Sequence, residues 1–245
     1  MTGPLTSVLT YALFPTAAAI VGALIATFRP PGPKLRSAIQ HFAAGVVFSV
    51  IAVELLPDIM RPHTGGAAVE VVIGFALGVV VMLVLRSLTE RWEKSADVGT
   101  VNLPVAFLAA VALDLLIDGL LIGIGFAAGA KEGKLLTLAL TVELLSLGLA
   151  IAVTLADGGA GRAKIVAITA ALTLMLMIGA LGGATLLASL PPSVLEIVFS
   201  FGLAALLFLV TEELLTEAHE VQETPWITSM FFAGFLLFLV LGMVG

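Results

Sequence analysis

Long apolar runs separated by short polar breaks dominate this chain, and their lengths predict membrane-spanning helices. A helix needs about 20 apolar residues to cross the hydrocarbon core of a bilayer. The breaks, rich in Pro, Gly or charge, leave eight spans at approximately Val8–Phe28, Ser37–Met60, Ala67–Ser87, Leu103–Ala130, Lys134–Ala156, Lys164–Ser189, Pro192–Ala218 and Pro225–Val244. The pattern therefore predicts an all-α polytopic membrane protein, with residues 1–245 forming one transmembrane domain.

Composition supports this prediction and excludes several classes of protein. Of the 245 residues, 60% are hydrophobic and only 11% are charged, whereas soluble domains contain about 25% charged residues. There is no cysteine, which excludes disulfides and thiolate metal sites. The net charge of −6 argues against a nucleic-acid partner, so the lipid bilayer is the expected environment. The first apolar run is too long for a signal peptide and is interpreted as a retained span.

Basic residues are distributed unequally between the two sides of the expected bundle. The breaks after the second, fourth and sixth spans carry only Arg61, Lys131 and Lys134. The other breaks carry eight basic residues: Arg29, Lys34, Arg36, Arg86, Arg91, Lys94, Arg162 and Lys164. Because Lys and Arg favour the cytoplasmic side, we expect both termini outside the cytoplasm, in a plasma (inner) membrane.

A short acidic segment occurs twice, in spans that would run in opposite directions. The second span contains E54-L-L-P-D58 and the seventh contains E213-L-L-T-E217, each after a long apolar run. The two segments would therefore lie at opposite faces of the membrane. This echo predicts an inverted repeat of spans one to three and six to eight, with spans four and five between them, a 3+2+3 plan that transporters use around a midplane site.

Two aspartates lie in the middle of the fourth span. Asp114 and Asp118 are four residues apart and so share one face of a helix, and no Lys, Arg or His lies between Asn102 and Lys131. An acidic side chain near the bilayer centre costs roughly 2.5–3.5 kcal/mol. The pair is therefore expected to face a polar pathway, bind a cation or hold protons.

A third central acid, Glu143, lies in the fifth span, and Ser146 is on the same face of that helix. Neighbouring helices could bring Glu143 to Asp114 and Asp118. Oxygen ligands of this kind suit hard divalent ions, so the four residues form a candidate metal site. Three carboxylates in a low dielectric need a bound metal or bound protons, and protonated acids that only pack remain the alternative.

The acids at the two ends of the spans suggest a route to and from this centre. Glu54 and Asp58 would form an outer entry, and Glu213, Glu217 and His219 an inner exit. The alternative is that these residues are helix ends close to lipid headgroups. Either interpretation places them at the membrane surfaces rather than at its centre.

Two further features concern the shape of the helices. Gly119, Gly123 and Gly125 follow the aspartates, and small residues allow close approach of membrane helices. Pro57 would free the carbonyl group of Val53 and could kink the second span.

The segment D114-L-L-I-D-G-L-L-I-G-I-G-F126 resembles span four of the ZIP (Zrt/Irt-like) divalent-metal transporters. V142-E-L-L-S146 is similar to the matching motif of span five, and E54-L-L-P-D58 and E213-L-L-T-E217 are similar to those of spans two and seven. The resemblance covers essentially the whole chain. It implies eight spans with outward termini, a divalent metal ion as substrate rather than cofactor, and a homodimer as one expected assembly.

This sequence departs from the ZIP pattern in ways that alter the expected site. Asp114 stands where His is usual and Leu115 where a polar ligand is common, while the sixth span, Lys164–Ser189, contains no acid. The resemblance therefore implies one metal site rather than two. Zinc, manganese, iron, cobalt and cadmium are not distinguished.

The expected function is movement of divalent metal cations towards the cytoplasm by alternating access around a midplane carboxylate site. The alternative is a proton-coupled transporter of a non-metal substrate that uses the same carboxylates as a proton relay. An enzyme is not expected, because the chain has no H-E-x-x-H, G-x-S-x-G or Cys nucleophile. A scaffold role would leave the central acids unexplained.

Overall fold

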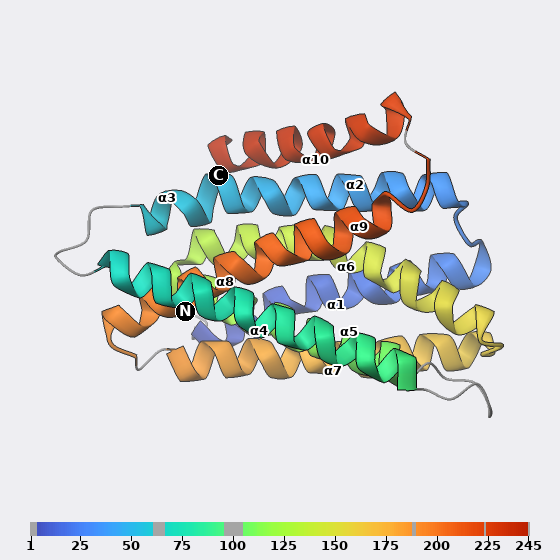
Figure 1. Ribbon diagram of the computed structural model, residues 1–245, viewed down its shortest axis with the longest axis horizontal. Helices are drawn as coiled ribbons and strands as arrows, with labels where there is room; N and C mark the ends of the chain where they lie inside the picture. Colours follow the sequence, from blue (N-terminus) through green and yellow to red (C-terminus); the bar gives the residue numbers. More distant parts are fainter. Residues whose placement is uncertain (1–3, 61–66, 96–104, 188–189, 223, 245) are drawn as a thin grey trace.

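Eight helical spans run side by side along the long axis of the molecule (Figure 1). The structure is a computed structural model that describes residues 4–60, 67–95, 105–187, 190–222 and 224–244. Six spans are single helices: α1 (Pro4–Phe28), α4 (Ala67–Ser95), α5 (Val105–Ala128), α6 (Ala130–Asp157), α7 (Arg162–Leu187) and α10 (Pro225–Val244). Two are interrupted by a π-helical turn: α2 (Pro33–Val50), η1 (Ile51–Leu55) and α3 (Leu56–Ile59), and α8 (Pro192–Phe208), η2 (Leu209–Leu214) and α9 (Leu215–Ala218).

The outward faces of the bundle are apolar. Large hydrophobic side chains such as Phe14 on α1, Ile73 on α4 and Leu237 on α10 are exposed at the protein surface. Soluble monomers rarely expose extended apolar patches, whereas the hydrocarbon tails of a lipid bilayer surround such surfaces favourably. With eight helices long and apolar enough to cross a bilayer among the described residues, the chain is an all-α integral membrane protein, which confirms the predicted fold class.

Some helices extend beyond the predicted apolar spans. α4 continues to Ser95 instead of ending at Ser87, and α6 begins at Ala130, so that the expected break K131-E-G-K134 is helical. Charged residues with long side chains are good helix formers once they leave the hydrocarbon region. Glu132 also lies in the first turn of α6, where a negative charge is favourable.

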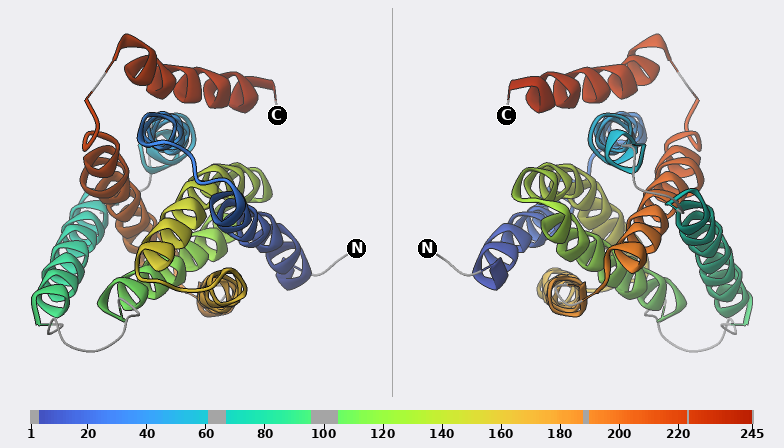
Figure 2. Two further views of the ribbon diagram at one scale, coloured as in Figure 1. Left: turned by 90° about the vertical axis from the view of Figure 1, so that its right-hand side faces the viewer. Right: turned by 90° about the vertical axis from the view of Figure 1, so that its left-hand side faces the viewer.

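The spans pack as two groups of four. One group contains α1, α5, α6 and α7, in which α5 lies along α7 and α1 along α6. In the other, α10 packs on α2 and α4 packs on α8 (Figure 2, which looks along the spans). This grouping combines spans one and six with the two central spans, and so divides both halves of the 3+2+3 order.

Glycine contacts in the first group follow the inverted repeat. Several glycines lie so close to a carbonyl oxygen of a neighbouring helix that an added Cβ would overlap it. They include Gly119 with Leu176, Gly179 with Leu116, Gly148 with Ala19, and Gly22 with Leu145. The same number of residues separates Gly119 from Gly148 and Leu116 from Leu145. That spacing also separates Asp114 from Glu143, so these two acids are counterparts in the repeat.

The two acidic segments each begin in a π-helical turn. The backbone N–H of Leu56 donates to the carbonyl of Ile51, and that of Leu215 to the carbonyl of Val210, five residues back in both cases. In the second span, Pro57 follows this turn. Proline has no backbone N–H, and Pro57 was expected to free the carbonyl group of Val53. π-turns inside helices often occur at functional sites.

Candidate metal centre

Three carboxylates meet in the interior where α5 and α6 pass each other. Ligand oxygens of Asp114, Asp118 and Glu143 all lie within 4.8 Å of one another. Asp118 is 2% exposed and Glu143 is 1% exposed, while Asp114 is half-buried. The expectation that helix packing gathers these three residues is therefore confirmed, while the binding of an ion remains a prediction.

Two oxygens of this group have no hydrogen-bond partner among the described residues. Asp118 Oδ2 and Glu143 Oε2 are buried and accept no hydrogen bond from any of these residues. A buried polar atom left in this state is costly, and more so when it is charged. A bound cation, a proton or water would satisfy both atoms, so the donor set fits a hard divalent ion.

A small cavity of about 30 Å³ lies beside the three carboxylates. Its polar lining consists of Gln40, Asp114, Glu143, Ser146, Glu213 and Glu217. Ser146 is 2% exposed and turns to the same cavity as Glu143, as their shared helix face predicts. Its role as a metal ligand remains a prediction.

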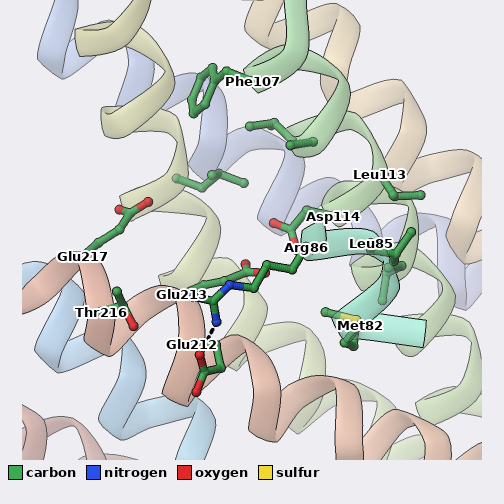
Figure 3. A pocket seen from close by; sticks show the side chains of 14 residues that line it. Met82, Leu85, Arg86, Phe107, Leu113, Asp114, Glu212, Glu213, Thr216 and Glu217 are labelled. Carbon is green, nitrogen blue, oxygen red and sulfur yellow. Dashed lines mark hydrogen bonds and ion pairs between the residues drawn. The ribbon is translucent and has the colours of Figure 1, made fainter. Parts of the chain in front are cut away.

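A larger cavity of about 280 Å³ leads from Asp114 towards the ends of α4 and α9. It shares Asp114, Glu213 and Glu217 with the small cavity. Figure 3 shows these three side chains around one space, with Arg86 reaching in from α4. Thr216 and Glu217 are exposed, so acidic side chains follow one another from the buried group to the surface.

The cavity exists because the packing departs from the inverted repeat. α2 packs along α6, whereas their counterparts α8 and α5 make few contacts. The larger cavity that Asp114 and Glu213 line lies among α4, α5, η2 and α9. The seventh span is thus separated from α5 at the α9 end of the bundle.

Arg86 and Glu212 form an ion pair at the mouth of the larger cavity (Figure 3). Their side chains are 42% and 44% exposed. The sequence gave no indication that Glu212 pairs with Arg86, which lies 126 residues away in the chain. Only the packing of α4 on α8 brings the two together.

Glu217 accepts a hydrogen bond from Gln40 on α2, with 2.5 Å between Gln40 Nε2 and Glu217 Oε2. Sequence reasoning missed Gln40, although a glutamine that is 2% exposed in an apolar span is itself a signal. His219 follows α9 at the same end of the bundle. The three residues of the expected exit, Glu213, Glu217 and His219, therefore lie together.

The expected entry is less fully described. Glu54 lies in η1 with 11% of its side chain exposed, 4.0 Å from Lys131 Nζ. It lines neither of the two cavities. The side chain of Asp58 lies outside the part of the chain that the structure describes. An entry route past Glu54 and Asp58 remains a prediction.

Comparison of the sequence with known proteins gave no matching family model and no matching curated relative.

Proposed function

We propose that this chain is a membrane transporter that moves divalent metal cations towards the cytoplasm, as a divergent member of the ZIP family. The observation that carries the proposal is the group of Asp114, Asp118 and Glu143, with two buried oxygens that no described residue satisfies. Three carboxylates in a membrane interior are costly unless a cation or protons neutralise them.

The cavity supports a transport role rather than a permanently bound ion. A structural metal would be sealed on every side, whereas Asp114 is shared between the buried group and a cavity of about 280 Å³. Glu213 and Glu217 offer further oxygen ligands along that cavity. An ion could thus leave the centre stepwise without losing all its ligands at once.

The direction of opening follows from the basic residues. Arg36, Arg86 and Arg91 belong to the α9 end of the bundle, and an excess of Lys and Arg marks the cytoplasmic side. The cavity therefore faces the cytoplasm in this state, with both termini outside, in the plasma membrane. Access from outside requires α6 to separate from α2 while α5 packs against α8. The packed contact and the open contact would then change places between the two halves of the repeat.

Uptake by the purified protein in lipid vesicles tests the proposal. Zinc, manganese, iron, cobalt and cadmium are offered separately, with and without a pH gradient. We expect uptake of at least one ion, and its loss in Asp118→Asn and Glu143→Gln. Glu132→Gln is the matched control, because it makes the same change on the same helix outside both cavities. Unchanged uptake in the Asp118→Asn, Glu143→Gln double variant contradicts the central site.

A proton-coupled transporter of a non-metal substrate is the second candidate. The observation that favours it is the lack of imidazole in the group of Asp114, Asp118 and Glu143, since protons alone could also neutralise these acids. Calorimetry of the dialysed protein separates the two. Binding of a divalent ion that Glu143→Gln abolishes supports the metal transporter, and the absence of any such binding supports the proton relay.

A further inference from the structure

Gln40 is the residue that α2 contributes to the small cavity beside the three carboxylates. The other polar residues of that lining belong to α5, α6 and the seventh span. Gln40 is 2% exposed, and a buried amide in a membrane span is costly unless its nitrogen and its oxygen both have partners. The contacts of the two ends of this amide therefore indicate what the residue does.

The nitrogen end of the amide is already used. Nε2 of Gln40 donates to Oε2 of Glu217, with 2.5 Å between the two atoms. An ionised carboxylate can only accept a hydrogen bond, so this contact decides which end of the amide is the nitrogen. The other end is the oxygen Oε1, to which no described residue donates a hydrogen bond. A buried acceptor is thus left for a cation or water in the cavity that Gln40 lines.

The small cavity has room for one ion or one water molecule. Its volume is about 30 Å³, and a single water needs about 10–15 Å³ of such space. Asp114 and Glu143 belong both to the carboxylate group and to the lining of this cavity, whereas Asp118 lines neither of the two cavities. An ion that moves from the carboxylate group into the cavity would therefore leave Asp118 and keep two of its ligands.

We propose that Gln40 Oε1 replaces Asp118 in this step and is a ligand of the departing ion, a role that rests on the proposed transport function. Amide oxygens are hard, neutral donors that bind divalent cations in proteins. The exchange keeps the number of oxygen ligands unchanged while their total negative charge falls by one. Lower charge weakens the attraction for the ion, which favours its release towards Glu213 and Glu217.

Gln40 also belongs to a different group of helices from the three carboxylates. Asp114, Asp118 and Glu143 lie on α5 and α6, which are in one group, whereas α2 is in the other. α2 packs along α6, so an ion between Gln40 and Glu143 is bound by both groups at once. Separation of α6 from α2 would part these two ligands. The ion therefore has the amide as a ligand only while the cavity opens at the α9 end.

Binding and uptake of Mn²⁺ test this role. The purified protein in detergent is titrated with Mn²⁺, whose unbound form is counted by electron paramagnetic resonance, and uptake by vesicles gives KM and kcat. Gln40→Met keeps the length of the side chain without its amide, and we expect about tenfold lower affinity. Gln40→Glu adds a negative charge at the same place, so we expect tighter binding with a lower kcat, because the ion is released more slowly. A residue that only packs would lower the affinity in both variants.

Ser37→Ala is the matched control on the same helix. Ser37 is 1% exposed, and its Oγ donates to the carbonyl of Ala218 at 2.7 Å. It joins α2 to α9 as Gln40 does, but it lies outside both cavities, so its replacement should leave Mn²⁺ affinity and kcat unchanged. An equal loss in Ser37→Ala and Gln40→Met overturns the proposal, because the amide would then act only by joining the two helices. If Gln40→Met does not fold, Gln40→Glu decides, since tighter binding supports the ligand and weaker binding overturns it.

The outcomes separate this role from transport itself. Mn²⁺ binding that depends on Gln40 and Glu143, in a protein that takes up no metal, supports the ligand and contradicts transport. Uptake that depends on Glu143 but is unchanged in Gln40→Met supports transport and overturns the ligand. A protein that binds no Mn²⁺ overturns the ligand as well, whichever other ion it takes up.

Discussion

The short acid–Leu–Leu segment occurs at both ends of the bundle, but its surroundings differ between the two ends. At the α3 end, Glu54 lies in a π-helical turn, is 11% exposed and sits beside Lys131. At the α9 end, Glu213 lies in the corresponding turn and lines a cavity that contains Asp114. The acid–Leu–Leu motif and its π-turn therefore do not decide which end is accessible. The two groups of helices also pack unequally, because α2 packs along α6 whereas α8 and α5 make few contacts.

The centre departs from the repeat as well. Asp114 and Glu143 are counterparts, but the position that corresponds to Asp118 is occupied by Leu147, which lines both cavities. α5 thus supplies two carboxylates and α6 only one. An ion held by all three moves with the group that contains both helices. Opening at either end is then a change in how that group packs against α2 and α8.

The largest expected effect concerns the group of α1, α5, α6 and α7, in which the glycine contacts of the two halves of the repeat match. Gly119→Ala and Gly148→Ala each place a Cβ against a backbone carbonyl of the next helix. Overlap of this kind in a packed interior costs about 1–3 kcal/mol, which exceeds the gain in helix propensity of up to about 1 kcal/mol. Denaturant unfolding in mixed micelles should show similar losses in free energy of unfolding for the two variants.

Gly182→Ala is the control for this pair, because no described atom lies within 4 Å of the added Cβ. It should be neutral or slightly stabilising. A large loss in Gly119→Ala with none in Gly148→Ala would mean that the two halves do not pack alike.

Accessibility of single cysteines tests the difference between the ends directly. The chain has no cysteine, so Thr216→Cys in the cavity and Ser49→Cys just before η1 each give one thiol. Thr216 is exposed, and Ser49 is 0% exposed. We expect a water-soluble maleimide to modify the thiol at 216 at least about tenfold faster, which corresponds to an opening cost of about 1.4 kcal/mol at the α3 end.

Equal rates for both thiols after denaturation are the control for intrinsic reactivity. Equal rates in the folded protein would show that both ends are open, and the contrast between them would then be lost.

The sequence predicted the spans because apolar length is a local property, and it predicted the central acids because their cost in lipid is local too. Asp114, Asp118 and Glu143 were found in this way. The extended ends of α4 and α6 were missed, because charge marks both loops and helix ends that emerge from the membrane. The echo between Glu54 and Glu213 indicated the repeat, but not the π-turn, which depends on hydrogen bonds rather than residue type.

The sequence did not predict contacts between spans that are far apart in the chain. The pairing of Arg86 with Glu212, of Gln40 with Glu217 and of His41 with His219 each requires a particular helix packing. Nor does the sequence determine that α2 packs along α6 while their counterparts α8 and α5 make few contacts.

A smaller effect is expected from Lys131 at the closed end. Lys131 Nζ lies 4.0 Å from Glu54 Oε1 and donates to the carbonyl of Gly242 at 3.3 Å, so it joins three spans. The lysine is 48% exposed, and a pair of this kind contributes about 1 kcal/mol or less. Lys131→Gln in the Ser49→Cys protein should therefore raise the maleimide rate severalfold at most.

Lys134→Gln is the matched control on the same helix, because Lys134 lies over the ring of Tyr11 instead of beside Glu54. If both variants raise the rate equally, a general loosening of α6 explains the change, and Lys131 has no special part in closing this end.

The smallest expected effect is at the open end. Arg86 and Glu212 are both more than two-fifths exposed, so Arg86→Gln should change the free energy of unfolding by less than about 1 kcal/mol. Its charge nevertheless stands at the mouth of the cavity that cations would pass in the proposed function. Removing it should raise the initial rate of metal uptake by about twofold at low ionic strength, with less effect in 0.15 M salt, where the Debye length is about 8 Å. Arg91→Gln, farther along α4 and outside the cavity, should leave uptake unchanged. A decrease with Arg86→Gln would instead mean that the ion pair keeps the mouth open, and that the open end, like the closed one, depends on a basic residue held between two helices.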